Sequence, residues 1–214
     1  MLDNERDGVN ELTNILHKGD LPDTLDLGSI VAIDCETMGL NLYRDRLCLV
    51  QLSGGDGIAH MVQIVAGQDS APNLCKLLAN EKILKVFHFG RFDIAALLKT
   101  FGVLTSPVYC TKIASKLVRT YTDRHGLKNL LQELLGIDIS KQQQSSDWGA
   151  VKLTDAQLEY AASDVLYLHS LKDELDLRLL REGRMDLAKS SFDFLPTRAR
   201  LDLIGWPETD IFAH

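Results

Sequence analysis

Four carboxylates and one tyrosine stand in the sequence where chemistry explains them better than packing does: Asp34, Glu36, Asp93, Asp164 and Tyr160. Asp34 and Glu36 lie at the end of an apolar run, residues 29–35, that is typical of a buried strand. Residues i and i+2 of a strand project to the same face, so these two carboxylates repel each other and resist desolvation. A bound divalent cation would remove both costs.

The other three residues extend this pattern. Asp93 opens a predicted helix shortly after the apolar run 83–88, and Asp164 follows Tyr160 by four residues, which places both on one helix face. Each of them alone has an ordinary explanation, as a partner of a helix dipole or as part of a solvated face. Together they predict two-metal phosphodiester hydrolysis, in which carboxylates bind two Mg²⁺ or Mn²⁺ ions about 4 Å apart and the tyrosine orients the attacking water.

Composition restricts the class of protein. The 214 residues are 45% hydrophobic and 25% charged, which is typical of one globular domain. The net charge of −7 excludes binding of long nucleic acid by overall charge, although not by a local basic face. The four cysteines form no zinc pattern, the chain has no apolar run of the roughly 20 residues that span a bilayer, and its first residues are polar. We therefore expect a cytoplasmic protein without a membrane partner.

The predicted elements alternate in a way that favours an α/β fold with a mixed sheet flanked by helices. Apolar, β-branched runs predict strands at residues 29–35, 47–53, 58–64 and 83–88, of which the second and third form a hairpin around a glycine-rich turn. Helical periodicity and capping signals predict helices at 71–80, 91–100, 111–121, 127–135 and 153–182. The residues after 183 are expected to form a short helix and a tail.

Three motifs resemble those of the DEDD 3′–5′ exonucleases: Ile33-Asp34-Cys35-Glu36-Thr37, the segment from His88 to Asp93, and Tyr160-Ala161-Ala162-Ser163-Asp164. The tyrosine form of the third motif is similar to the ribonuclease D-like, or DEDDy, branch of the ribonuclease H-like fold. The second motif often carries an Asn before its Asp. Here Phe89 or Gly90 stands in that place, so an Asn contact with the substrate is missing. Segments 110–116, 121–128 and 141–148 resemble a compact subfamily, NanoRNase C.

The resemblance implies roles for these residues. Asp34, Glu36, Asp93 and Asp164 would hold two divalent cations, and Tyr160 would position the nucleophilic water. Leu40 would be a wedge between the terminal bases, and the backbone of Thr37 and Met38 would meet the 3′-terminal sugar. The implied activity is hydrolysis of short RNA, down to dinucleotides, to nucleoside 5′-monophosphates by a ring-shaped homo-octamer; some relatives also attack DNA.

The resemblance also suggests a division of the chain. Residues 1–28 would be an N-terminal arm, residues 29–183 the 3′–5′ exonuclease domain, and residues 184–214 an extension that packs on the domain or at an oligomer interface.

Several polar side chains are candidates for the substrate side. The segment from residue 112 to residue 128 contains one acid, Asp123, and five basic residues: Lys112, Lys116, Arg119, Arg124 and Lys128. They form either a solvated helix face or an edge that grips phosphates, for which we select Lys112 and Arg124. His88 and Gln144 are either structural or in contact with the substrate. Trp148 is either a stacking platform or a core anchor, and the second reading is slightly favoured.

Three other functions remain open at this stage. A broader 3′–5′ exonuclease would act on longer RNA or DNA, and a catalytically inactive nucleic-acid-binding module could retain the fold. A phosphatase built on Asp34 would need a second Asp where Glu36 stands, and the sequence lacks its Lys or Ser partner motif.

Overall fold

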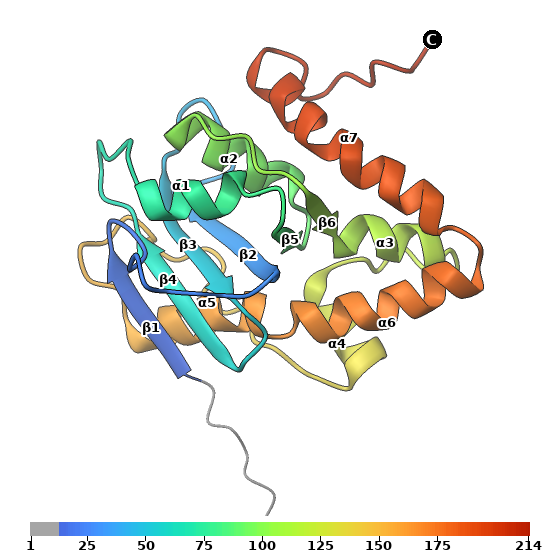
Figure 1. Cartoon of the computed structure of the whole chain (residues 1–214), viewed down its shortest axis with the longest axis horizontal. Coiled ribbons are helices and arrows are strands. Elements are labelled where there is room, and N and C mark those ends of the chain that lie inside the picture. Colours follow the sequence, from blue (N-terminus) through green and yellow to red (C-terminus); the bar gives the residue numbers. More distant parts are fainter. Residues whose placement is uncertain (1–12) are drawn as a thin grey trace, which may run out of the picture.

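A six-stranded mixed sheet forms the centre of the molecule, as seen in the computed structural model, which describes residues 13–214 (Figure 1). The strand order is β1-β4-β3-β2-β5-β6. The pairs β2–β3 and β3–β4 are antiparallel, whereas β1–β4, β2–β5 and β5–β6 are parallel. The strands are β1 Thr13–Lys18, β2 Ile30–Thr37, β3 Leu47–Ser53, β4 Ile58–Gln63, β5 Leu84–Phe87 and β6 Val108–Cys110. The α/β class, the mixed sheet and the β3–β4 hairpin are thus confirmed.

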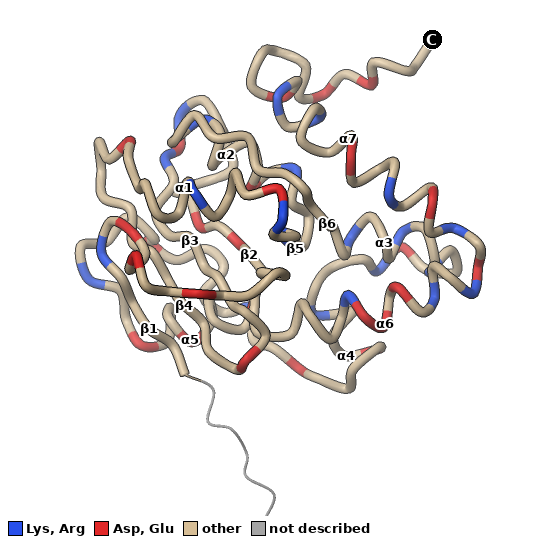
Figure 2. The backbone as a smooth tube through the Cα atoms, viewed as in Figure 1, with Lys and Arg blue, Asp and Glu red and all other residues tan. Residues whose placement is uncertain are grey.

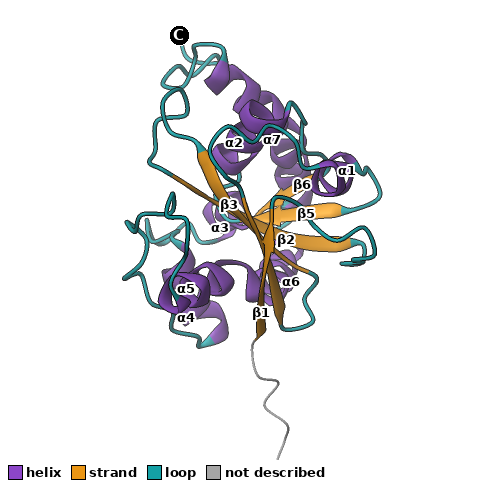
Figure 3. Cartoon of the chain, turned by 90° about the vertical axis from the view of Figure 1, so that its left-hand side faces the viewer, coloured by secondary structure: helices purple, strands orange, loops and turns teal. Residues whose placement is uncertain are grey.

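Helices cover both faces of the sheet. Helices α1 and α2 lie over one face, and α5 and α6 over the other (Figure 3). The helices are α1 Pro72–Ala79, α2 Arg91–Phe101, α3 Thr111–Val118, α4 Leu127–Leu135, α5 Asp155–Leu166, α6 Leu168–Arg181 and α7 Met185–Leu203. No helix in the described part of the chain is long and apolar enough to cross a membrane.

Strand β2 lies in the interior of the sheet, which explains its composition. Val31, Ala32 and Ile33 have no exposed surface because neighbouring strands and helices cover both faces of the strand. Its last residues reach the edge of this apolar layer, and the pairing with β3 is irregular between Glu36 and Thr37. The strand therefore carries its carboxylates from a rigid core to the surface of a cleft.

Two predictions about helices were wrong. The predicted helix 153–182 is broken at Tyr167, whose backbone (φ −105°, ψ 0°) ends α5 and begins α6. Helix α5 packs across β2, β3 and β4, while α6 packs on β5, α3 and α4, so the break lets the chain follow the twisted sheet. The segment after residue 183 forms a helix of 19 residues, which continues through Pro196 because its buried face, including Phe192, Leu195 and Ala199, packs on the domain.

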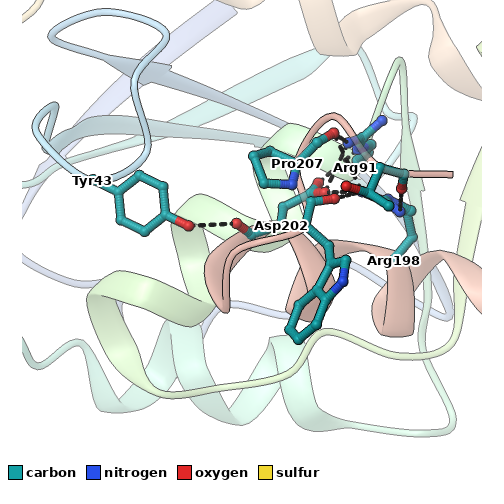
Figure 4. Close-up of polar contacts among 7 residues, drawn as sticks. Tyr43, Arg91, Arg198, Asp202 and Pro207 are labelled. Atoms are coloured by element: carbon teal, nitrogen blue, oxygen red, sulfur yellow. Dashed lines mark hydrogen bonds and ion pairs between the residues drawn. The ribbon is translucent and has the colours of Figure 1, made fainter. Parts of the chain in front are cut away.

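The end of α7 is tied to the start of α2 by a buried carboxylate (Figure 4). Asp202 is 4% exposed and accepts two bonds from Arg91, at 2.6 and 2.8 Å, and one from Arg198 at 2.7 Å. Arg91 and Arg198 also donate to the Pro207 carbonyl, and the Tyr43 hydroxyl donates to the Asp202 carbonyl at 2.9 Å. This network, the Asp202 latch, fixes the extension on the domain.

The described chain bears out some further expectations and leaves others open. All four cysteines are free, and three of them are buried. Residues 13–18 of the predicted arm form an edge strand, β1, while residues 1–12 lie outside the described part. The domain boundaries at residues 28 and 183 stay predictions.

Candidate active site

The structure brings the predicted acids together. Asp34 and Glu36 of β2 and Asp164 of α5 each offer a carboxylate oxygen, and these three oxygens lie within 4.8 Å of one another. Asp93, in the first turn of α2, stands beside them and accepts hydrogen bonds from the backbone and the thiol of Cys35. Residues separated by as many as 130 positions in the chain therefore form one acidic cluster.

Topology explains this convergence. Strand β5 runs parallel to β2, so the loop after β5 brings the start of α2 next to the end of β2. Helix α5 can approach the sheet closely because Ala161 and Ala162 are small and buried. Tyr160 lies one turn before Asp164, and its hydroxyl donates a hydrogen bond to the Asp164 carboxylate.

The cluster is electrostatically costly without a cation. Burial, and then the charges of the neighbouring carboxylates, raise the pKa of Asp34 well above its usual value. The same causes raise the pKa of Glu36 to about 9, and burial raises the pKa values of Asp93 and Asp164 to about 7. Among the described residues, no ion pair involves any of the four. A cluster of carboxylate oxygens of this kind is a suitable set of ligands for Mg²⁺ or Mn²⁺.

Gln51 is a residue of the site that the sequence analysis missed. It lies opposite Asp34 in the β2–β3 register, and its Nε2 is 3.5 Å from Asp34 Oδ2. The side chain is fully buried, and its Oε1 has no hydrogen-bond partner. A polar residue inside the apolar run 47–53 was the signal that could have identified it.

A cleft of about 390 Å³ opens over the acids. Of the predicted substrate residues, five line it: Thr37, Leu40, His88, Lys112 and Gln144. Met38 and Arg124 are exposed but do not line the cleft.

Of the two readings of Trp148, the structure agrees with the core anchor and not with the stacking platform, so this residue leaves the set of substrate candidates. Its side chain is 3% exposed and packs 6.0 Å, centroid to centroid, from the ring of Tyr160. A core anchor that supports Tyr160 leaves no face on which a base could stack.

The basic segment is also corrected in part. Arg119 is fully buried and pairs with Glu133, so it cannot grip a phosphate. Figure 2 shows the basic positions of α3 and the acidic positions of β2. Lys128 of the same segment lines the cleft with Lys112, and so does Lys141, which the sequence analysis did not single out.

The wall beside the acids contains one unusual backbone position. Phe89 has a φ of 66°, in the left-handed region, and its ring is exposed in the cleft. His88 before it is hydrogen-bonded to the Thr111 hydroxyl at 2.9 Å. Burial, and then the charges of Lys112 and Lys141, lower the pKa of His88 to about 3, so this imidazole is neutral at physiological pH.

Comparisons with known proteins agree with this geometry. A family model described as a 3′–5′ exonuclease matches residues 7–180, and the chain therefore belongs to this family. Ribonuclease D of Acidiphilium cryptum (strain JF-5) is 39% identical over 166 residues, which are 78% of this chain and 42% of that protein. The chain thus spans less than half the length of that relative.

Solved structures give a more specific likeness. NrnC of Brucella melitensis bound to pGG is 61% identical, with a TM-score of 0.92 over 95% of this chain and 99% of that one. The structure described as the same protein with bound Mg²⁺ is 60% identical, with a TM-score of 0.91 over 94% and 99% of the two chains. The predicted ribonuclease D-like family, the exonuclease fold and the likeness to the compact subfamily are confirmed.

Proposed function

We propose that this chain is a metal-dependent 3′–5′ exoribonuclease that hydrolyses short RNA, down to dinucleotides, to nucleoside 5′-monophosphates. The observation that carries the proposal is the convergence of four carboxylates and Tyr160 in one cleft of a 3′–5′ exonuclease fold. Support for the substrate comes from NrnC, a protein of nearly equal length that is 61% identical and was solved with pGG bound.

In this proposal Asp34, Glu36, Asp93 and Asp164 hold two divalent cations, Mg²⁺ or Mn²⁺. When bound, the cations lower the pKa of a water molecule and neutralise charge on the phosphate. Tyr160 positions the attacking water. Burial and the nearby Asp164 raise the pKa of its hydroxyl, so it keeps its proton, donates to the Asp164 carboxylate and can accept a hydrogen bond from the water through its oxygen.

The walls of the cleft would hold the two ends of a short substrate. Leu40 is an apolar side chain that is 87% exposed at the rim, as a wedge between bases requires. Lys112, Lys128 and Lys141 supply positive charge for phosphates in an otherwise acidic protein. Because the number of phosphates neutralised sets electrostatic affinity, three lysines suit a substrate with few phosphates.

The remaining expectations belong to the same proposal. The cytoplasmic location rests on the four free cysteines. The ring-shaped homo-octamer rests on the resemblance to NanoRNase C and on exposed apolar residues after α7, including Trp206 and Phe212. Light scattering of the purified protein measures the assembly, and a monomeric mass would reject it.

Asp34→Asn tests the activity with almost no change in side-chain shape. The variant should lose Mg²⁺-dependent hydrolysis of a labelled ladder of two- to ten-residue RNAs while its circular dichroism spectrum stays that of the parent. Asp69→Asn, at an exposed acid that does not line the cleft, is the matched control and should retain activity. Full activity of Asp34→Asn would reject the assignment.

The rival functions are separated by the same ladder. A comparison of a dinucleotide with a long strand at equal concentrations of 3′ ends distinguishes the short-RNA enzyme from a broad exonuclease. A binding module without catalysis would show metal-independent binding and no products with either substrate.

A further inference from the structure

The connection between β2 and β3, residues 38–46, carries Leu40 at the rim of the cleft. The side chain of Leu40 is 87% exposed, so it receives little packing from its neighbours. A side chain in this state keeps its place only if the backbone that carries it is held. The contacts that hold the backbone of the connection therefore decide where the proposed wedge stands.

Asp45 is the residue to which this backbone is tied. Within residues 38–46, all of which the structure describes, it is the only one that is buried. Its Oδ2 accepts a hydrogen bond from the amide of Asn41 at 3.0 Å, and its own amide donates to the Asn41 carbonyl at 2.8 Å. One bond through the side chain and one through the backbone thus close the chain directly after Leu40.

Arg44 orients the carboxylate of Asp45. Its Nε lies 2.7 Å from Oδ1 and its Nη2 lies 2.9 Å from Oδ2, which is the two-point pairing of a guanidinium with a carboxylate. The side chain of Arg44 is 74% exposed, so the pair contributes little stability and mainly sets the direction of the carboxylate. Lys99 of α2 donates to the Asp45 carbonyl at 3.3 Å, which links the connection to the body of the domain.

Gly39 shows how closely this carboxylate approaches the backbone beside Leu40. The φ of Gly39 does not lie in the left-handed region that favours glycine, so this angle gives no reason for a glycine here. A Cβ at Gly39 would lie 2.5 Å from Oδ2 of Asp45 and 3.1 Å from its Cγ. Contact with Asp45 therefore excludes a side chain at position 39, and the two residues belong to one packing arrangement around Leu40.

The segment before Leu40 is held without Asp45. The Met38 amide donates to the Arg46 carbonyl at 3.0 Å, which extends the pairing of β2 with β3 by one step. Loss of the Asp45 carboxylate should therefore release Leu40 and the residues after it. The backbone of Thr37 and Met38, proposed to meet the 3′-terminal sugar, should stay in place.

We propose that Asp45 is a positioning residue that holds Leu40 at the rim, where it can enter between the two terminal bases of the substrate. Asp45 does not line the cleft, so it acts through Leu40. A loop that is ordered beforehand loses less conformational entropy when the substrate binds. This inference rests on the proposed function and assigns the placement of its wedge to an acid outside the metal site.

Two substrates distinguish this role from a general weakening of the fold. A dinucleotide has two bases between which Leu40 can stand, whereas the p-nitrophenyl ester of a nucleoside 5′-monophosphate has one. Asp45→Ala should lower kcat/KM for the dinucleotide with Mg²⁺ by about five- to tenfold, and Gly39→Ala should do so by displacing the Asp45 carboxylate. The value for the ester should stay within about twofold of the parent in both variants. Circular dichroism confirms the fold of each protein beforehand.

Asp56→Ala is the matched control. Its carboxylate also accepts a backbone amide, that of Ile58 at 3.1 Å, but in a turn that does not line the cleft, so neither value should change. The double variant Leu40→Ala/Asp45→Ala tests whether the acid acts through the leucine. It should hydrolyse the dinucleotide within about twofold of Leu40→Ala alone, because the wedge that Asp45 holds is already absent.

Three results would overturn the positioning role alone. They are equal losses on both substrates in Asp45→Ala, a dinucleotide value equal to that of the parent in Asp45→Ala or Leu40→Ala, and losses that multiply in the double variant. A parent protein that hydrolyses neither substrate would instead reject the proposed function, and the role of Asp45 with it.

Discussion

The Asp202 latch offers the sharpest test of how this fold holds its site. Asp202→Asn keeps the shape of the side chain and removes its charge, which leaves Arg91 and Arg198 facing a neutral amide. Breaking a buried ion pair costs about 3–5 kcal/mol. The side chains of Arg91 and Arg198 are 34% and 15% exposed, so water partly solvates the abandoned guanidinium groups. We therefore expect a loss of about 2–3 kcal/mol in the free energy of unfolding.

For a chain of this size, such a loss lowers the melting temperature by about 4–12 °C, which thermal denaturation measures directly. The matched control is Asp193→Asn, an exposed acid on the same helix, which should melt within about 1 °C of the parent. Comparing Arg91→Gln, Asp202→Asn and the double variant isolates the coupling between the two residues. A melting temperature of Asp202→Asn equal to that of the control would refute the reasoning.

The latch also predicts an effect on hydrolysis. Arg91 is the first residue of α2 and lies two positions before Asp93, and Tyr43, bonded to the Asp202 carbonyl, follows the Leu40 loop. Loosening the latch should lower kcat severalfold at temperatures where the variant is fully folded. Unchanged kcat alongside reduced stability would limit the latch to holding α7.

Two further predictions concern charge in the cleft. Asp34→Asn should melt at a higher temperature than the parent in EDTA, because it removes repulsion among buried carboxylates, and it should lose much of the stabilisation that Mg²⁺ gives the parent. A parent that melts higher than the variant in EDTA would contradict this. The pKa of His88 is lowered to about 3 in the folded state. Below pH 6.5 the unfolded chain therefore binds a proton at this imidazole, whereas the folded chain does not. Between pH 6.5 and 5 the parent should lose about 2 kcal/mol more stability than His88→Gln, as denaturant titrations at each pH would show, and equal losses would argue against a neutral buried His88.

The acidic cluster could be predicted because its acids stand in segments that otherwise contain apolar or small residues. Asp34 interrupts an apolar strand, and Asp164 lies among small residues that only a close helix–sheet contact requires. The position of an acid relative to a strand end is a local property, and parallel neighbours bring strand ends to the same edge of a sheet. Gln51 is different, because its role depends on the register of β3 against β2, which hairpin length and the irregularity at Glu36 decide together.

The errors arose where long-range packing overrides local preference. Helical periodicity runs through Tyr167 without a glycine or proline, so nothing local predicts that α5 and α6 separate to follow different strands. Arg119 continues the helical spacing of Lys112 and Lys116 in the sequence, yet α3 ends at Val118, and Arg119 at its C-cap is buried, where Glu133 compensates its charge. Spacing predicts which residues share a face; it does not tell whether that face meets solvent or another helix.

The cleft contains two kinds of charge that would act on the substrate in different ways. Its lining includes the carboxylates of β2, α2 and α5 together with lysines from α3, α4 and the loop after residue 140. Without cations the carboxylates repel a phosphodiester while the lysines attract it, so binding and hydrolysis depend on different groups. Removing the metal should therefore abolish cleavage while the lysines retain part of the affinity for a short RNA. Substituting Lys128 should weaken binding with the metal still held, because this side chain lines the cleft from α4 and, among the described residues, pairs with Asp138 and with none of the four acids.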